Sequence, residues 1–289
     1  MKNKKFIFII GESTGLECFK EILKLKIIDI SHVISSNKNY NLIIRKICKI
    51  NDISFSSSNN HRINEIKYKN NKDIEYILIS IFSNLIIDKK ILKKFNYKCF
   101  NFHPGLLPLY PGKNCVSGAI YNQEKSTAVT LHKMKQKIDE GKIIFKKKIS
   151  INVKKETLIS LMLKLKFATI DMVKKFIIHI YKNKTIKMYK NDISKKKYFP
   201  KYIPNKGLIN KDTSFKDFDK IFRSSYSGPF ENSWGKVFFI YNKQKKIIFE
   251  YNIINKRKIY FPSNSKIIKM KKNNFILAIK NKILAVKTF

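Results

Sequence analysis

The chain has 289 residues, and its 61 Lys and Arg residues against 20 Asp and Glu give a formal net charge of +41. This length is enough for one large domain or two modest ones with an ample core. Because no stretch reaches the ~18 uninterrupted apolar residues of a transmembrane helix, the sequence predicts no membrane span, and the apolar run before Gly11 is too short for a signal peptide.

The positive charge by itself would suggest a nucleic acid or an anionic membrane as partner. Only four of the basic residues are Arg, however, while Lys, Asn and Ile are abundant throughout, which is typical of drift toward A/T-rich codons. Because Arg contacts phosphates and bases through two parallel hydrogen bonds, we interpret most of the charge as background. The four cysteines have no metal-ligand spacing, so we predict no metal site and free thiols in a reducing cytoplasm.

Apolar runs alternate with helical patterns through the first part of the chain. Strands are predicted over Phe6 to Ile10, Asp29 to Ser35, Ile53 to Ser56, Tyr76 to Phe82, Lys98 to Phe102, Thr127 to Met134 and Lys142 to Ile151. Helices are predicted over Leu16 to Leu25, Tyr40 to Lys49 and Thr157 to Tyr181. This alternation favours a Rossmann-like, mostly parallel α/β sheet, although GESTG after the first strand is not a proper dinucleotide fingerprint.

Two of these helices carry apolar stripes in the sequence. In the helix over Tyr40 to Lys49, the apolar residues that the pattern places on one face are Leu42, Ile43, Ile47 and Ile50. The longest helix carries a stripe of Leu158, Leu161, Leu165, Ala168, Met172 and Phe176. We expect the stripe of the longest helix to pack on the sheet.

The pattern changes after the longest helix. Residues 183–206 are polar and contain Pro200 and Pro204, as in a linker. Beyond Gly207, a helix predicted from Ser214 to Ser224 is followed by short apolar runs with Asn, Lys and Ser turns. The sequence therefore predicts a large α/β domain over residues 1–182, a linker over 183–206 and a small β-barrel-like domain over 207–289.

Three polar side chains are predicted to meet at the ends of two strands. Asn101 and His103 lie one residue apart at the end of a predicted strand, so their side chains point the same way. A second strand, Thr127 to Met134, leads to Asp139 in a turn closed by Gly141. We therefore expect Asn101, His103 and Asp139 to converge.

These side chains suit the transfer of an acyl group between nitrogens. A neutral His103 can accept a proton from an attacking amine, Asp139 can orient the imidazole, and the Asn101 amide can donate to a developing oxyanion. The rate would then fall on the acid side, near an ordinary histidine pKa. Apart from Cys115, no candidate for a covalent nucleophile lies near these residues in the sequence. Direct transfer, without a covalent enzyme intermediate, is therefore the simpler interpretation. Taken singly, a His at a strand end or an Asp in a turn is more often structural.

This part of the chain resembles the formyltransferases that use 10-formyltetrahydrofolate, in the runs NFHPGLLP (residues 101–108), VTLHKM (129–134) and IDEG (138–141). The resemblance implies that Asn101, His103 and Asp139 are the catalytic residues. It also implies a Rossmann-like catalytic domain followed by a small, OB-like β-barrel domain, with 10-formyltetrahydrofolate as co-substrate. In this family the pterin ring is held largely through backbone groups, and the matching positions here are Leu85, Ile86, Ile87 and Ile138.

The resemblance leaves the acceptor amine open. Family members formylate an amino-sugar nucleotide, the methionyl group of initiator tRNA or glycinamide ribotide, and the second domain argues against the last. The short stretch Ser36 to Asn39 and the VTLHKM run favour the amino-sugar branch, with Lys113, Asn114 and His132 as candidate substrate contacts. Initiator tRNA is the alternative acceptor. A more remote alternative is a polyanion-binding relative that has kept the fold but not the formyl transfer. A homodimer is possible.

Overall fold

The computed structural model describes residues 3–58, 62–63, 66, 73–230, 232–254, 259–261 and 266–289. The chain forms two compact units that interleave along the sequence. The first unit comprises Met1–Cys115, Thr127–Ile149 and Leu163–Tyr198, and the second comprises Val116–Ser126, Ser150–Met162 and Phe199–Phe289. Neither unit is one continuous stretch of the chain, so the units cannot be matched directly to the expected ranges 1–182, 183–206 and 207–289. These domain boundaries stay a prediction.

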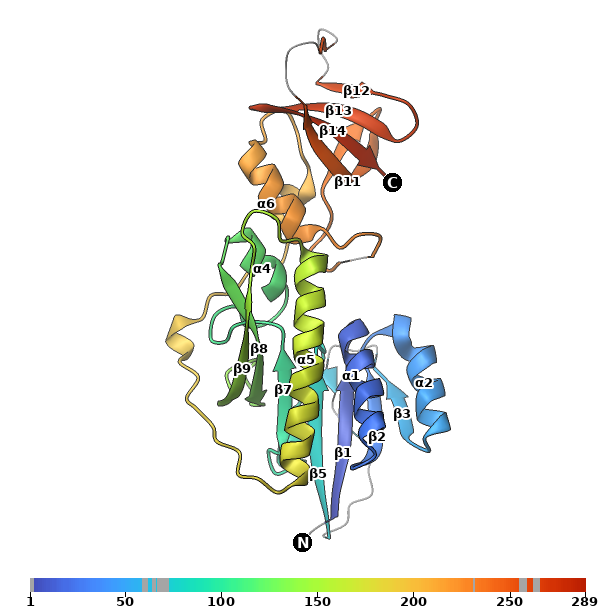
Figure 1. The fold of residues 1–289 in the computed structure, drawn as a ribbon, viewed down its shortest axis with the longest axis vertical. Coiled ribbons are helices and arrows are strands. Elements are labelled where there is room, and N and C mark those ends of the chain that lie inside the picture. The colour runs from blue at the N-terminus through green and yellow to red at the C-terminus, as the bar shows by residue number, and fades with distance from the viewer. Residues whose placement is uncertain are drawn as a thin grey trace. The chain divides into compact units, whose positions relative to one another are not determined.

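A seven-stranded sheet forms the centre of the first unit (Figure 1). Its strands are β1 (Asn3–Ile10), β2 (Asp29–Ser35), β3 (Ser54–Ser57), β5 (Ile74–Ile81), β7 (Cys99–His103), β8 (Ser126–Lys133) and β9 (Ile143–Ser150), in the order β3-β2-β1-β5-β7-β8-β9. The first five pair in parallel, and β8 runs antiparallel to β7. The predicted Rossmann-like, mostly parallel sheet is therefore confirmed. Two short strands, β4 (Arg62–Ile63) and β6 (Ile86–Ile87), form a separate parallel pair.

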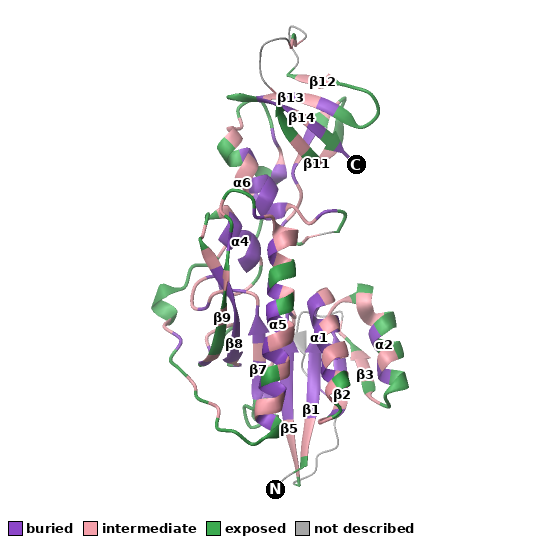
Figure 2. Cartoon of the chain, in the orientation of Figure 1, coloured by how far each residue is buried: buried purple, intermediate pink, exposed green. Residues whose placement is uncertain are grey.

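The core of this sheet comes from continuous apolar strands. Residues Phe6 to Ile10 of β1 are almost completely buried, as parallel strands covered on both faces must be. Figure 2 shows the same buried colour along β5 and β7. Gly11 follows β1 because a Cβ at this position would overlap the carbonyl oxygen of Phe82. The first turn thus needs a glycine so that the ends of β1 and β5 can approach each other.

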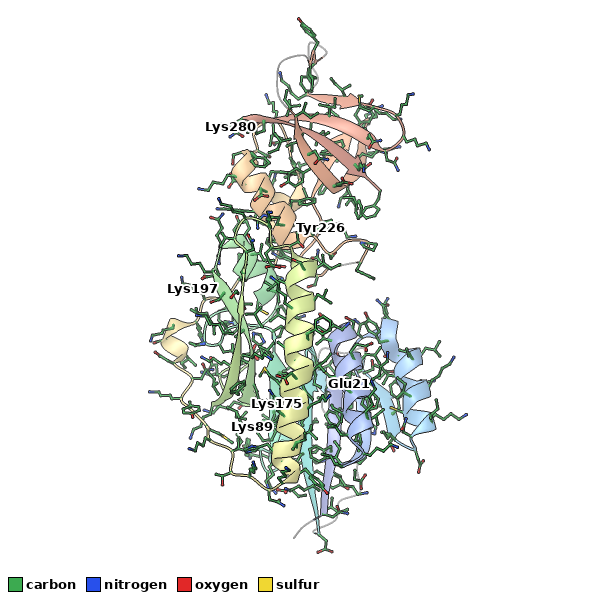
Figure 3. The ribbon with its side chains drawn as sticks, in the orientation of Figure 1. Glu21, Lys89, Lys175, Lys197, Tyr226 and Lys280 are labelled. Atoms are coloured by element: carbon green, nitrogen blue, oxygen red, sulfur yellow. The ribbon has the colours of Figure 1, made fainter. Side chains whose placement is uncertain are left out.

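Five α-helices and two 3-10 turns of the described chain precede Phe199. They are α1 (Glu12–Leu25), η1 (Lys38–Tyr40), α2 (Asn41–Ile50), α3 (Lys89–Lys94), α4 (Cys115–Tyr121), α5 (Leu158–Tyr181) and η2 (Ile193–Lys195). In α5, the ring of Phe176 packs edge-on against Phe100 and Phe102 of β7. The carboxylate of Glu21 on α1, labelled in Figure 3, lies 3.4 Å from the ammonium of Lys174 on α5.

The two apolar stripes expected from the sequence have different outcomes. The stripe of α5 is confirmed, since its members from Leu161 to Phe176 are buried. The apolar face of α2 that the sequence pattern defines is not the buried one, because Leu42 and Ile50 are exposed to 69% and 82% while the helix buries Ile44 and Cys48. Among the residues that the structure describes, no helix is both long enough and apolar enough to cross a membrane.

The second unit contains a curled antiparallel sheet in the order β10-β11-β14-β13-β12 (Figure 1). Its elements are η3 (Pro204–Gly207), α6 (Phe215–Ser225), β10 (Phe238–Tyr241), β11 (Gln244–Ile254), β12 (Ile267–Lys269), β13 (Asn274–Ile279) and β14 (Lys282–Thr288). Ser214 caps α6 by accepting from the backbone N–H of Asp217 at 3.1 Å. The predicted small β domain is therefore confirmed.

Candidate active site

Strands β7 and β8 place the expected polar residues at one edge of the sheet. Asn101 and His103 point the same way from β7, as their spacing predicts. On β8, His132 is the register partner of Asn101, and Thr130 is the partner of His103. The side chain of His132 is therefore delivered beside Asn101 by strand pairing alone.

Asp139 connects these side chains to one another. Its Oδ2 lies 3.4 Å from His103 Nδ1, and its Oδ1 lies 3.2 Å from His132 Nε2 and 3.5 Å from Asn101 Nδ2. Oδ2 also accepts from the backbone N–H of Gly112 at 2.8 Å. The structure thus brings together Asn101, His103 and Asp139, the three residues that the sequence singled out.

The imidazole of His103 is held at both nitrogens. Its Nε2–H donates to the carbonyl oxygen of Tyr110 at 2.9 Å, while Nδ1 faces Asp139. Gly105 leaves room for the ring, since a Cβ there would lie 2.6 Å from His103 Nε2. Two acceptors on opposite sides of the ring favour the doubly protonated form.

The electrostatics of the site agree with this geometry. Burial alone would lower the pKa of His103, but the Asp139 carboxylate, with smaller effects of Cys115 and the Tyr110 carbonyl, outweighs burial and raises the pKa to about 9. Burial alone would raise the pKa of Asp139, but the charge of His103 and the hydrogen bonds from His132 and Gly112 hold that pKa well below its usual range. The geometry and the direction of both pKa shifts therefore favour an imidazolium and a carboxylate, whereas the sequence analysis expected a neutral His103.

Asn101 keeps part of its amide free for a ligand. Its Nδ2 lies 3.2 Å from His132 Nε2, and the 3.5 Å separation from Asp139 Oδ1 is long for a hydrogen bond. The amide oxygen is buried and has no hydrogen-bond partner among the described residues. The N–H that faces Asp139 makes only this long contact, so it can exchange the contact for a bond to a ligand oxygen.

A cavity of about 160 Å³ opens onto these side chains. Its apolar walls are Leu85, Ile86, Ile87 and Ile138, the four residues expected to hold the pterin ring. Lys113 and His132 also line the cavity, whereas Asn114 does not. His132 has only 2% of its side chain exposed and contacts Asn101 and Asp139, so its principal contacts lie within the polar cluster.

Several other residues line the cavity and were not named as site residues from the sequence, namely Ser80, Ser83, Asn84, Met134, Lys135 and Gln136. Gly112 had no assigned role, although it lies in a Pro- and Gly-rich loop and matches the family's pattern. Its positive φ of 78° turns its N–H toward Asp139. Across the described residues, no group of three His, Cys, Asp or Glu side chains is arranged to hold a metal ion.

An α/β sheet with an amide, an imidazolium and a carboxylate at the base of an apolar cavity is the arrangement of a group-transfer enzyme. The sequence comparisons identify the kind of group-transfer enzyme. The family model described as formyl transferase matches residues 7–177. The chain belongs to this family.

Curated relatives match parts of the chain. The bifunctional polymyxin resistance protein ArnA of Wigglesworthia glossinidia brevipalpis is 34% identical over 178 residues, which are 60% of this chain and 26% of that protein. The methionyl-tRNA formyltransferase of Thermotoga neapolitana is 30% identical over 155 residues, which are 50% of this chain and 43% of that protein. The matches thus span less than half the length of either relative.

A solved structure matches the whole chain. The N-formyltransferase from Helicobacter canadensis, in complex with folinic acid and dTDP-3-aminofucose, superposes with a TM-score of 0.67 over 100% of both chains, at 19% identity. This likeness establishes the formyltransferase fold for both parts of the chain.

Proposed function

We propose that the protein transfers a formyl group from 10-formyltetrahydrofolate to the primary amine of a nucleotide-linked amino sugar. The observation that carries this proposal is the convergence of Asn101, His103 and Asp139 at the base of the apolar cavity, with contacts of 3.2 to 3.5 Å through Asp139 and His132. Membership of the formyl transferase family supports the reaction class. The dTDP-linked amino sugar named in the Helicobacter canadensis structure supports the acceptor class.

The chemistry follows from charges in the site. The acceptor nitrogen attacks the formyl carbon, the bond from that carbon to N10 of the folate breaks, and the proton lost by the amine ends on N10. Negative charge develops meanwhile on the formyl oxygen. The positive charge of His103 stabilises this developing charge, Asp139 keeps His103 protonated, and the Asn101 amide lies beside them to donate to the same oxygen. Because the two ring nitrogens of His103 already face Tyr110 and Asp139, His103 acts through its charge, in place of the general base expected from the sequence.

The apolar cavity suits the folate. Leu85, Ile86, Ile87 and Ile138 form flat apolar walls, and the backbone groups between Leu85 and Ile87 can pair with the edges of a pterin ring. Lys113 lies at the same cavity and is exposed, so it can approach a diphosphate. We keep Lys113 as a candidate acceptor contact, and we assign His132 to the support of Asn101 and Asp139.

The protonation state of His103 is directly measurable. We expect the His103 imidazole to titrate near pH 9 in the native protein, because the Asp139 carboxylate stabilises its cation. In Asp139→Asn that stabilisation is lost, and the midpoint should fall toward the ordinary histidine value of about 6.5. NMR of the imidazole Cε1–H, assigned by comparison with His103→Ala, gives both values. A wild-type midpoint at or below about 6.5 would restore the neutral base to the mechanism.

The acceptor is tested with a panel of substrates. Purified protein with 10-formyltetrahydrofolate should formylate at least one dTDP-, UDP- or GDP-linked 3-amino or 4-amino sugar. The formylated product is detected by mass spectrometry. Activity on a two-phosphate ligand should change little between low and moderate salt, whereas binding of tRNA through many phosphates should weaken by orders of magnitude. Formylation of methionyl-tRNA at physiological salt, with none on any sugar, would establish the alternative that the Thermotoga relative's name suggests. Activity on neither would favour a polyanion-binding relative.

A further inference from the structure

The segment that follows α5 packs against the first unit. Residues 183–198, here called the strap, leave the end of α5 and run back beside β9 (Figure 1). Tyr189 and Ile143 form an antiparallel bridge, with N–H to carbonyl distances of 2.9 and 2.7 Å. From the sequence we expected this stretch to be part of an interdomain linker. The strap instead reaches the turn that carries Asp139.

Asn191 makes the contact between the strap and this turn. Its side-chain Nδ2–H donates to the backbone carbonyl of Asp139 at 2.8 Å, and the residue is 7% exposed. Its amide oxygen has no hydrogen-bond partner among the described residues. Only the nitrogen end of the amide can face a carbonyl oxygen. The bond to Asp139 therefore fixes the orientation of this buried amide.

Asp139 needs such a restraint. Its φ is +55°, in the left-handed region that non-glycine residues rarely adopt. A residue in this conformation persists only when surrounding contacts determine it. A change of φ at Asp139 toward the common negative region would turn its carbonyl away from Asn191, and it would also move the carboxylate away from His103 Nδ1 and the Gly112 N–H.

We propose that Asn191 is a positioning residue that holds the Asp139 backbone, so that the carboxylate stays between His103 and Gly112. The catalytic consequence rests on the proposed formyl transfer, but the electrostatic consequence does not. The charged or titratable groups that face His103 are Asp139, the Cys115 thiol and, across Asp139, His132. Of these, Asp139 is the group whose charge raises the pKa of His103 most. The pKa of His103 therefore reports the position of Asp139.

The test compares Asn191→Ala with Asn191→Asp, which keeps the shape of the side chain but replaces the donor by an acceptor. We expect the NMR titration midpoint of His103 to fall in both variants by about one pH unit or more, from about 9 toward about 6.5. Turnover should fall about tenfold, while KM for the folate should stay within about twofold, because the cavity walls are unchanged. If the alanine variant fails to fold, the isosteric Asp variant supplies the same readout.

A matched control lies on the same strap. Lys196 pairs with Glu140, the neighbour of Asp139, at 2.8 Å and is partly exposed, so Lys196→Met should leave the His103 midpoint and turnover unchanged. A His103 midpoint that stays near 9 in the Asn191 variants would overturn the proposal, even with reduced turnover. A lowered midpoint in a protein without formyl transfer would support the role of Asn191 and reject the proposed reaction instead.

Discussion

Replacement of Asp139 by Asn is expected to lower the turnover of formyl transfer by about 10²-fold or more, the usual scale for groups that control proton position. The amide keeps the shape of the side chain but removes the charge that raises the pKa of His103. His103 is then largely neutral at pH 7, and its positive charge no longer stabilises the charge on the formyl oxygen. His103→Ala should have a similar effect, because it removes the cation itself. Turnover is measured by mass spectrometry of the formylated acceptor under saturating folate.

Binding separates a catalytic role from a structural one. Both variants should retain folate affinity within a few fold, measured by calorimetry, because the apolar walls of the cavity do not involve either residue. His179→Ala and Asp171→Asn are matched controls, since both residues lie on α5 and neither lines the cavity. These controls should turn over as the wild type does. Wild-type turnover in both site variants would remove His103 and Asp139 from the mechanism.

The position of the polar cluster was readable from the sequence because short-range rules determine it. Asn101 and His103 share a face through the two-residue period of a strand. Asp139 follows the antiparallel strand β8, whose carboxyl end lies beside Phe100 at the start of β7, so the turn after β8 has to bring the carboxylate back to His103. The apolar walls were found through resemblance, since Ile and Leu are too common in this chain for any one of them to indicate a site.

The same abundance of isoleucine explains why the apolar face of α2 that the sequence pattern defines is exposed. A chain rich in Ile and Lys presents apolar residues on several helical faces, so the stripe chosen from the pattern included Leu42 and Ile50, which are exposed. Burial is decided by the neighbour that the helix meets. The register of α2 on the sheet selects Ile44 and Cys48, and that register is a tertiary property.

The charge of His103 and the role of Asn191 could not be predicted from local sequence. The pKa of His103 depends on a 3.4 Å contact with Asp139, and on the Tyr110 carbonyl that engages the other ring nitrogen. Asn191 lies 52 residues beyond Asp139, in a polar stretch with the composition of a linker. Both features arise from long-range contacts, which residue spacing does not encode.

Gly141→Ala is expected to destabilise the protein more than any other glycine substitution near the site. A Cβ at Gly141 would overlap the carbonyl group of Lys133, and this group is backbone, so no flexible side chain can move out of the way. The same carbonyl accepts from His132 Nδ1 at 3.1 Å, and the N–H of Lys133 donates to Lys142 at 2.9 Å. Relief of the overlap must therefore disturb both bonds, at a cost of about 3 kcal/mol.

For a domain of this size, such a cost lowers the midpoint of thermal unfolding by roughly 6–12 °C. Gly112→Ala is the matched control, because its Cβ would meet nothing within 4 Å and the strain is limited to a φ of 78°. That strain should cost about 1 kcal/mol and lower the midpoint by roughly 2–4 °C. Calorimetry of the wild type, Gly141→Ala and Gly112→Ala measures the three midpoints of thermal unfolding and shows which variant is less stable. Equal midpoints for the two variants would show that the turn after Asp139 yields easily, and that its backbone does not hold His132 in place.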